Sequence, residues 1–386
     1  MSTEDGFDVH GKSSILASKG RNVIVNGRFL TRRPTGVDRF AYEVLRAWDS
    51  LIRDGDSSAA ATRVRIAVPS GAVCETMFDH IPIVPVGNRS GQLWEQLDLP
   101  LAVGSDEVLL SLCNTAPAFF RRQVVVVHDA ATARVPTAFS RGFRAWYRLL
   151  MPLLGRTARG VLTVSDFSRQ ELEAAFSFPP GKTQVVVEGG EHILRQEVDM
   201  GALERFGLAD RPYVLAVSSM AVHKNFRLVL DALDLLPDAG FDVAIAGGAN
   251  ARVFGTNGML ASDRVKWLGY VSDAELRTLY ASAMCFVFPS IYEGFGIPPL
   301  EAMNCGCPVL AARAASIPEV CGDAALYFDP RSPAQLAKRL TEVSGDAQLR
   351  TTLREKGWVQ AGRFSWQTAA RQVMVACTSV MAGVSQ

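Results

Sequence analysis

The fold of this chain is indicated first by the stretch Ile291-Tyr292-Glu293-Gly294-Phe295-Gly296-Ile297-Pro298-Pro299-Leu300-Glu301-Ala302-Met303. A glycine-rich loop that leads into a helix presents unpaired backbone N–H groups at the positive end of the helix dipole, and these favour a phosphate. Glu293 lies before the turn, where its carboxylate can bind hydroxyl groups beyond the phosphate. Glu301 lies inside the helix, where it can bind the cis-diol of a ribose. On residue types alone, a structural strand–loop–helix corner with Glu301 paired to an arginine explains the stretch equally well.

Apolar runs of strand length alternate with amphipathic helical stretches from residue 21 to about residue 328. This alternation is typical of parallel sheets that are covered by helices on both faces. The predicted strands are residues 22–27, 64–68, 108–112, 124–128 and 161–164 in the first half, and 213–217, 243–246, 265–268, 285–288 and 308–311 in the second. Because 386 residues are too many for one ordinary core, the sequence predicts an α/β chain with two Rossmann-like, doubly wound domains.

Turn residues divide the chain near residue 195. The run Phe178-Pro179-Pro180-Gly181 and the stretch from Glu188 to Pro212 are rich in turn residues and charge, as a linker would be. We therefore expect an N-terminal domain over residues 21–195, a C-terminal domain over residues 196–363 and a final helix over residues 364–386. Residues 1–20 are polar and lack the pattern of a signal peptide, so we expect a disordered leader there.

Composition excludes several classes of protein. Forty Lys and Arg residues against 39 Asp and Glu residues give a net charge of +1, so no overall field attracts nucleic acid. Seven scattered cysteines, an odd number, do not suggest a disulfide framework and favour reduced thiols in a cytoplasmic protein. Cys305-x-Cys307 lacks the spacing and the nearby histidine of a zinc site, so we expect no metal and no cofactor. No apolar run reaches the ~18–20 residues that span a bilayer, so we expect a soluble or peripheral protein.

The spacing Glu293-x7-Glu301 around Gly-Phe-Gly resembles the signature of family 4 retaining glycosyltransferases, which have the GT-B fold. The likeness includes Cys305-Gly306-Cys307-Pro308-Val309, Ser316-Ile317-Pro318-Glu319-Val320-Cys321-Gly322-Asp323-Ala324-Ala325, Trp94-Glu95-Gln96-Leu97-Asp98-Leu99-Pro100 and Val164-Ser165-Asp166-Phe167-Ser168. It extends over most of residues 22–378. The resemblance implies two domains that face each other across a cleft, with a nucleoside diphosphate sugar held mainly by the second. It also implies that the last helix crosses back to the first domain.

In the first domain, the predicted strand over residues 124–128 ends in His128-Asp129, at the edge where open α/β sheets bind ligands. A lone histidine more often makes a hydrogen bond in the core. The resemblance instead implies that His128 approaches the donor sugar, and that Asp129 orients it or faces the acceptor. In the loop after the first strand, Gly36 can let the backbone approach a phosphate, and Arg39 can bind either the diphosphate or an anionic acceptor.

In the second domain, Val217-Ser218-Ser219-Met220-Ala221-Val222-His223-Lys224-Asn225 follows a predicted strand and opens a helix. The resemblance implies that Lys224 neutralises the leaving diphosphate. In the family this lysine commonly has an arginine near it. Here the preceding residue is His223, which is charged only part of the time near neutral pH. We therefore expect Lys224 and backbone N–H groups to stabilise the leaving group. The donor-binding loop would consist of Gly294, Phe295, Gly296 and Ile297.

The resemblance implies a metal-independent retaining glycosyltransferase that transfers a hexose, with mannose favoured, from a nucleoside diphosphate sugar to a glycan or lipid-linked saccharide in polysaccharide biosynthesis. Glu293 would hold the sugar hydroxyls and Glu301 the ribose. No Asp or Glu nucleophile is expected near the strand ends of the first domain, which agrees with attack from the front face. A GT-B sugar-nucleotide epimerase and a non-catalytic sugar-nucleotide-binding partner are the alternatives.

Residues 141–151, Arg-Gly-Phe-Arg-Ala-Trp-Tyr-Arg-Leu-Leu-Met, mix arginines with aromatic and aliphatic residues at helical spacing. Such a helix can dock on an anionic membrane. A helix whose apolar side packs in the first domain, with solvated arginines, explains the pattern as well. This stretch is therefore the candidate for peripheral contact with the inner face of the cytoplasmic membrane.

Overall fold

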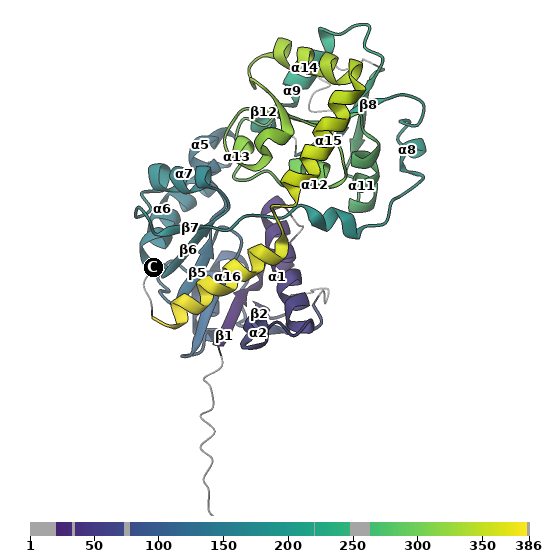
Figure 1. Cartoon of the computed structure of the whole chain (residues 1–386). Helices are drawn as coiled ribbons and strands as arrows, with labels where there is room; N and C mark the ends of the chain where they lie inside the picture. The colour runs from purple at the N-terminus through teal and green to yellow at the C-terminus, as the bar shows by residue number, and fades with distance from the viewer. Residues whose placement is uncertain (1–20, 33–34, 73–77, 220, 248–262, 384–386) are drawn as a thin grey trace, which may run out of the picture.

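The computed structural model describes residues 21–32, 35–72, 78–219, 221–247 and 263–383. The predicted leader over residues 1–20 lies outside the described residues. Two α/β domains are stacked along the long axis of the molecule in Figure 1, and each contains one parallel sheet. This arrangement confirms the predicted fold class.

The N-terminal sheet has seven strands in the order β3-β2-β1-β4-β5-β6-β7. Its strands are β1 (Arg21–Asn26), β2 (Thr62–Pro69), β3 (Ile83–Val86), β4 (Glu107–Ser111), β5 (Gln123–Val126), β6 (Gly160–Thr163) and β7 (Thr183–Val185). Its helices are α1 (Gly36–Arg53), α2 (Ser57–Ala60), α3 (Gly91–Leu93), α4 (Leu99–Ala102), α5 (Ala131–Arg134), α6 (Arg141–Thr157) and α7 (Asp166–Phe176). The chain winds outward to β3 and then resumes at β4, so the sheet is doubly wound about β1 and β4.

The C-terminal sheet has six strands in the order β10-β9-β8-β11-β12-β13, which is the same winding. Its strands are β8 (Tyr213–Val217), β9 (Asp242–Ala246), β10 (Val265–Gly269), β11 (Cys285–Phe288), β12 (Val309–Ala312) and β13 (Ala325–Phe328). Its helices are α8 (Ala202–Arg205), α9 (Phe226–Asp234), α11 (Asp273–Ser282), α12 (Ile297–Asn304), α13 (Ile317–Cys321), α14 (Pro333–Gly345) and α15 (Ala347–Ala361). The reversal of strand order between β8 and β11 creates the point where such sheets bind ligands.

Every predicted strand overlaps an observed one, but the sequence did not predict β3, β7 and β13. All three lie at sheet edges. Edge strands are short and partly exposed, so they lack the continuous apolar run that marks a central strand. The central β5, by contrast, is buried along its whole length.

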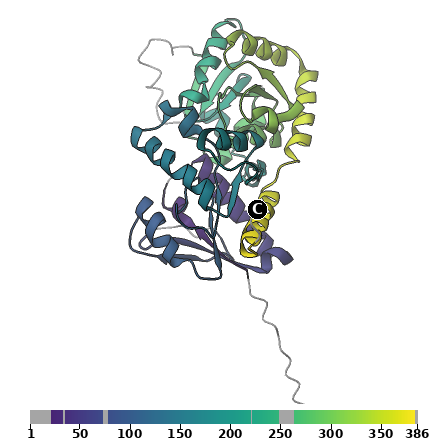
Figure 2. The same ribbon diagram turned by 90° about the vertical axis from the view of Figure 1, so that its left-hand side faces the viewer.

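The last helix, α16 (Trp366–Met381), leaves the C-terminal domain and packs against α1 and the N-terminal sheet. Figures 1 and 2 both show this yellow helix alongside the lower domain. Trp366 at its start is 1% exposed, and its ring meets Phe40 of α1 edge-on, with centroids 6.0 Å apart. The helix therefore holds the two domains together by apolar packing.

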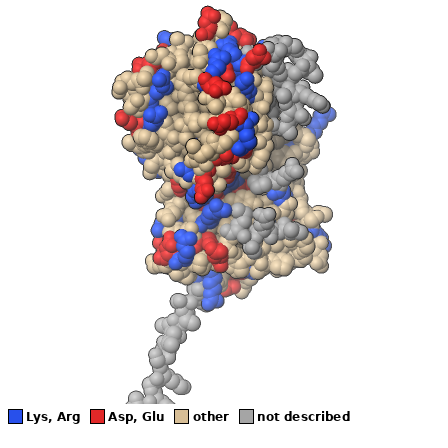
Figure 3. Space-filling view, turned by 90° about the vertical axis from the view of Figure 1, so that its right-hand side faces the viewer, with Lys and Arg blue, Asp and Glu red and all other residues tan. Residues whose placement is uncertain are grey.

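The surface carries charges of both signs. On the face in Figure 3, basic and acidic side chains are interspersed over both domains. Among the described residues, no helix combines the length and the apolar character that crossing a bilayer requires.

Candidate active site

Lys224 and Glu293 meet at the carboxyl ends of β8 and β11. The Lys224 Nζ lies 2.7 Å and 2.8 Å from the two carboxylate oxygens of Glu293, and both side chains are largely buried. Asn225, which has a left-handed φ of 59°, fixes this turn because its Nδ2 donates to the carbonyl oxygens of Pro289 and Pro330. The cation and the carboxylate that were predicted for one ligand therefore neutralise each other in the protein alone.

The donor loop, residues 293–297, presents backbone N–H groups at the start of α12. Gly296 is the N-cap, with a φ of 114° that favours glycine. The Ser316 hydroxyl lies 3.0 Å from the carbonyl oxygen of Glu293 and 2.7 Å from that of Phe295, so it holds these carbonyls on the buried side. Within the described residues, the N–H groups of Phe295, Gly296 and Ile297 have no acceptor. They are free to bind an anion.

The donor loop is docked on the N-terminal domain at Gly294. The Ser165 hydroxyl donates to the Gly294 carbonyl oxygen at 2.5 Å. The Ser168 hydroxyl lies 2.9 Å from the same oxygen and 2.7 Å from the carbonyl oxygen of His128, and it shares its proton between them. A Cβ at residue 294 would lie only 2.5 Å from the backbone oxygen of His128. Next to it, the Tyr292 hydroxyl accepts a hydrogen bond of 3.1 Å from the N–H of Ala130. These contacts bring residues of the two domains together, and the roles of the two serines were not predicted.

His128 lies at the end of β5, but both of its ring nitrogens are occupied. Its Nε2 is 2.9 Å from the carbonyl oxygen of Leu112, and its Nδ1 is 3.3 Å from the carboxylate of Glu188. Burial lowers the pKa of His128, but the Glu188 carboxylate opposes this and the net pKa is raised. Burial has the opposite effect on the carboxylate, because it disfavours the charged form, and the pKa of Glu188 is raised. Glu188, which was predicted only as the start of the linker, is thus the partner that orients His128.

Two carboxylates, one buried and one half-buried, lie near the strand ends of the first domain. The buried one is Glu188, and the other is Asp129, whose Oδ1 accepts a hydrogen bond of 2.7 Å from the N–H of Ala131. Burial raises the pKa of Asp129, and the negative charge of Glu293 adds to this effect. The sequence could not show this clustering because the three acids come from different loops. The expectation that no nucleophile lies at these strand ends stays a prediction.

Glu301 lies on α12, and both of its carboxylate oxygens face protein groups. One oxygen accepts a hydrogen bond of 3.0 Å from the Tyr280 hydroxyl, and the other lies 2.8 Å from Nε2 of His192. Nδ1 of the same histidine accepts a hydrogen bond of 3.1 Å from Nε1 of Trp366. Glu301, the residue predicted to bind the ribose, is therefore connected through His192 of the interdomain linker to Trp366 of α16.

The other predicted site residues lie around this centre. Gly36 is the first residue of α1, and a Cβ there would meet nothing within 4 Å, so packing does not require the glycine. Arg39 forms a bidentate ion pair of 2.7 Å and 2.8 Å with Asp273 of the other domain. His223 is half-buried, and burial together with Lys224 lowers its pKa, which favours the neutral ring. Its buried Nδ1 has no hydrogen-bond partner among the described residues.

Metal-binding groups are not gathered in the described part of the chain, where no cluster of three or more His, Cys, Asp or Glu side chains could hold an ion. The six described cysteines are free thiols: Cys113, Cys285, Cys305, Cys307, Cys321 and Cys377.

Several known proteins are similar to this chain in sequence or in structure. A family model described as glycosyl transferases group 1 matches residues 204–358. O-antigen chain mannosyltransferase B of Escherichia coli is 35% identical over 272 residues, which cover 67% of this chain and 70% of that protein. O-antigen chain mannosyltransferase RfbU of Salmonella typhimurium is 28% identical over 244 residues, which cover 61% of this chain and 65% of that protein. The solved structure of Anabaena HepE in complex with UDP has a TM-score of 0.71 at 19% identity and covers 93% of this chain and 100% of that chain. This chain therefore belongs to the group 1 glycosyltransferases and has the GT-B fold.

Proposed function

We propose that this protein transfers a hexose, with mannose favoured, from a nucleoside diphosphate sugar to a saccharide or lipid-linked saccharide during polysaccharide synthesis. One observation carries the proposal: Lys224 and Glu293 form a close pair at the strand-order reversal, beside unpaired N–H groups of the donor loop. A cation and free amides suit a diphosphate, and a carboxylate suits sugar hydroxyls. The similarity to mannosyltransferases of O-antigen chains supports mannose.

Donor binding would exchange the internal ion pair for contacts with the donor. The diphosphate takes the ammonium of Lys224, and the released Glu293 accepts hydrogen bonds from hydroxyls of the sugar. Glu301 still has free lone pairs beside Tyr280 and His192, and these can accept from the ribose. Because the pKa of His223 is lowered, the positive charge at the leaving group comes mainly from Lys224.

The transfer step would proceed with retention and without a metal. As the bond between the sugar and the diphosphate breaks, negative charge grows on the leaving oxygen, and Lys224 and the N–H groups of the donor loop stabilise it. The leaving phosphate takes the proton of the acceptor hydroxyl, which attacks from the same face. Glu188 lies 3.3 Å from Nδ1 of His128, and this mechanism assigns neither residue the role of a nucleophile.

A thermal-shift experiment with GDP, UDP and ADP tests the donor site. A ligand that binds only the native state at about 100 times its Kd stabilises the fold by about 2.7 kcal/mol. We expect GDP to raise the melting temperature most, and no shift with any nucleotide would contradict the donor site. We then expect transfer from GDP-mannose to a lipid-linked saccharide extract, with an α-linked product. Release of a free epimerised sugar would favour the epimerase, and nucleotide binding without any turnover would favour the non-catalytic partner.

We also propose that the protein is cytoplasmic and contacts the inner face of an anionic membrane through α6. Phe143 is 40% exposed and Leu149 is 68% exposed on this helix, beside the exposed Arg144 and Arg148. Apolar tips flanked by cations suit the interface of an anionic bilayer. We expect sedimentation with phosphatidylglycerol vesicles but not with phosphatidylcholine vesicles. Leu149→Glu should abolish it, whereas Leu235→Glu, at a site 54% exposed on the C-terminal domain, should not. Sedimentation that is independent of anionic lipid would contradict the proposal.

A further inference from the structure

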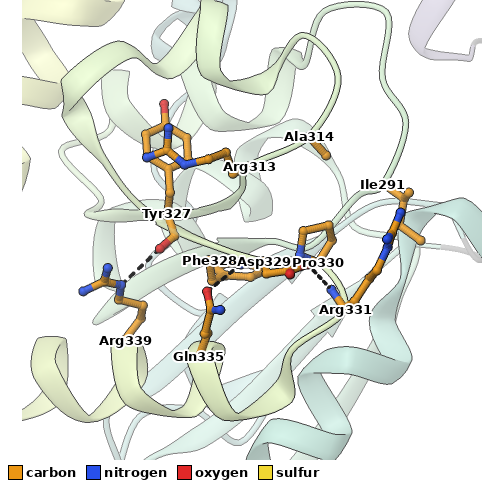
Figure 4. A pocket seen from close by; sticks show the side chains of 10 residues that line it. All are labelled: Ile291, Arg313, Ala314, Tyr327, Phe328, Asp329, Pro330, Arg331, Gln335 and Arg339. Atoms are coloured by element: carbon orange, nitrogen blue, oxygen red, sulfur yellow. Dashed lines mark hydrogen bonds between the residues drawn. The ribbon is translucent and has the colours of Figure 1, made fainter.

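A second pocket lies beside the donor loop, where β11, β12 and β13 end (Figure 4). Ile291 follows β11, Arg313 follows β12, and Asp329 to Arg331 follow β13, while α14 forms one side. The pocket has a volume of about 570 Å³, within the range of about 300–1,000 Å³ for sites that bind small molecules. The carboxyl ends of parallel strands are also where open α/β sheets bind ligands.

Two arginines of this pocket have no counter-ion. Within the described part of the chain, no carboxylate pairs with the side chain of Arg313 or Arg331. The Arg313 guanidinium lies over the Tyr327 ring, 4.4 Å from its centroid, so the N–H groups at its rim can still donate. Figure 4 shows Arg331 extending toward Ile291. Asp329 is the acid among the lining residues, and it binds the backbone N–H of Arg331, so positive charge predominates.

The same pocket is tied to the turn that carries Lys224. Asn225, the next residue, donates from its Nδ2 to the carbonyl oxygen of Pro330 at 2.9 Å. Ile291, which also lines the pocket, donates its N–H to the carbonyl oxygen of His223 at 2.8 Å. The pocket and the donor-binding turn therefore share backbone contacts, and a ligand in the pocket would lie next to the proposed transfer site.

We propose that this pocket is a second substrate-binding site, for a saccharide that carries a phosphate or a carboxylate. The planar guanidinium groups of Arg313 and Arg331 match such oxyanions. Gln335, whose Oε1 accepts from the N–H of Asp329, keeps its amide N–H groups for sugar hydroxyls. The charged sugar is either part of the acceptor or a free sugar phosphate. The link to transfer rests on the proposed function, but binding of the charged sugar does not.

Isothermal titration of the full chain with glucose 6-phosphate, glucuronate and glucose tests the binding. We expect the two charged sugars to bind at least about tenfold more tightly than glucose, a preference that Arg313→Gln/Arg331→Gln removes. Arg53→Gln/Arg371→Gln is the matched control, because it removes two exposed arginines from α1 and α16. Lys224→Gln should keep the preference. The site is overturned if the charged sugars bind no better than glucose, if the pocket variant keeps the preference, or if Lys224→Gln abolishes it.

Transfer kinetics distinguish the two sources of the charged sugar. If the acceptor carries the anion, Arg313→Gln/Arg331→Gln raises KM about tenfold for an acidic acceptor and leaves KM unchanged for its neutral analogue. If a free sugar phosphate is the ligand, both KM values are unchanged, and added glucose 6-phosphate alters kcat/KM of the unsubstituted protein alone. If neither of these two effects is observed, the proposed role of the pocket in transfer is overturned. A protein that keeps the binding preference but transfers no sugar would contradict the proposed function and leave the pocket assignment standing.

Discussion

Gly294→Ala should separate donor binding from transfer. The new methyl group would lie 2.5 Å from the backbone oxygen of His128 and 3.1 Å from Cβ of Asp129, about 1 Å inside ordinary contact with the oxygen. The donor loop would have to withdraw, which lengthens the hydrogen bonds from Ser165 and Ser168 to the Gly294 carbonyl. At about 0.5–1.5 kcal/mol each, losing both costs about 1–3 kcal/mol, which lowers the equilibrium constant for docking by about 5- to 150-fold.

We expect kcat/KM to fall by a similar factor, about 5- to 150-fold, because transfer needs the donor loop against the N-terminal domain. The Kd for the nucleotide should change by less than about threefold, since most of the proposed donor contacts lie in the C-terminal domain. Steady-state kinetics, isothermal titration and the melting temperature measure these effects separately. Gly240→Ala is the control, because a Cβ there meets nothing within 4 Å. Wild-type kcat/KM in Gly294→Ala would refute the claim that this close approach is needed.

Two further substitutions test the charges of the site. Lys224→Gln should lower kcat by about 10²–10³-fold by removing a donor to the leaving group. Arg227→Gln, which removes an exposed cation nearby, should have almost no effect. Glu188→Gln should reverse the pH dependence of stability due to His128. In the wild type the raised pKa gives stability that is present below about pH 6.5 and is lost as pH rises through the raised value. In the variant, burial is opposed only by the Leu112 carbonyl and the Asp129 charge, so we expect a lowered pKa and a stability that falls as pH drops below about 6.5. Melting curves and the NMR titration of the His128 ring would show this. An unchanged slope would refute the pairing with His128.

The sequence was sufficient for the central strands, because burial on both faces leaves a continuous apolar run such as the valines of β5. It was insufficient for three edge strands, β3, β7 and β13, although it did predict the fourth, β10. The edge strand β3 is only partly buried and contains Pro85, and β7 has only three residues. Proline and partial exposure both weaken the strand signal, although neither prevents pairing at an edge. The three strands were therefore not predicted because edge strands tolerate proline and partial exposure. The winding order could still be expected from the alternation of strands and helices.

For the candidate site, the residue types in the sequence indicated which loops and helices form it, but not which side chains pair with one another. The sequence placed Lys224 and Glu293 in loops that follow predicted strands of the second domain, yet it assigned them separately to diphosphate and sugar rather than to each other. Arg39 was assigned to a ligand, but in the structure it pairs with Asp273, which is 234 residues away. Such pairings depend on how two domains dock, and no local spacing encodes that. The ligand roles of these residues stay predictions.

The linker explains how ribose binding could be coupled to domain position. Because Nδ1 of His192 accepts from Nε1 of Trp366, the proton of a neutral ring must lie on Nε2, which faces Glu301 at 2.8 Å. The Tyr280 hydroxyl, which donates to the other carboxylate oxygen at 3.0 Å, orients the carboxylate before any nucleotide arrives. Glu191 accepts in turn from the N–H of Trp366, at the start of the helix that crosses to the N-terminal domain. A movement of α16 relative to α12 must therefore break this chain of contacts or carry Glu301 with it, so a ligand that holds Glu301 also biases where the N-terminal domain lies.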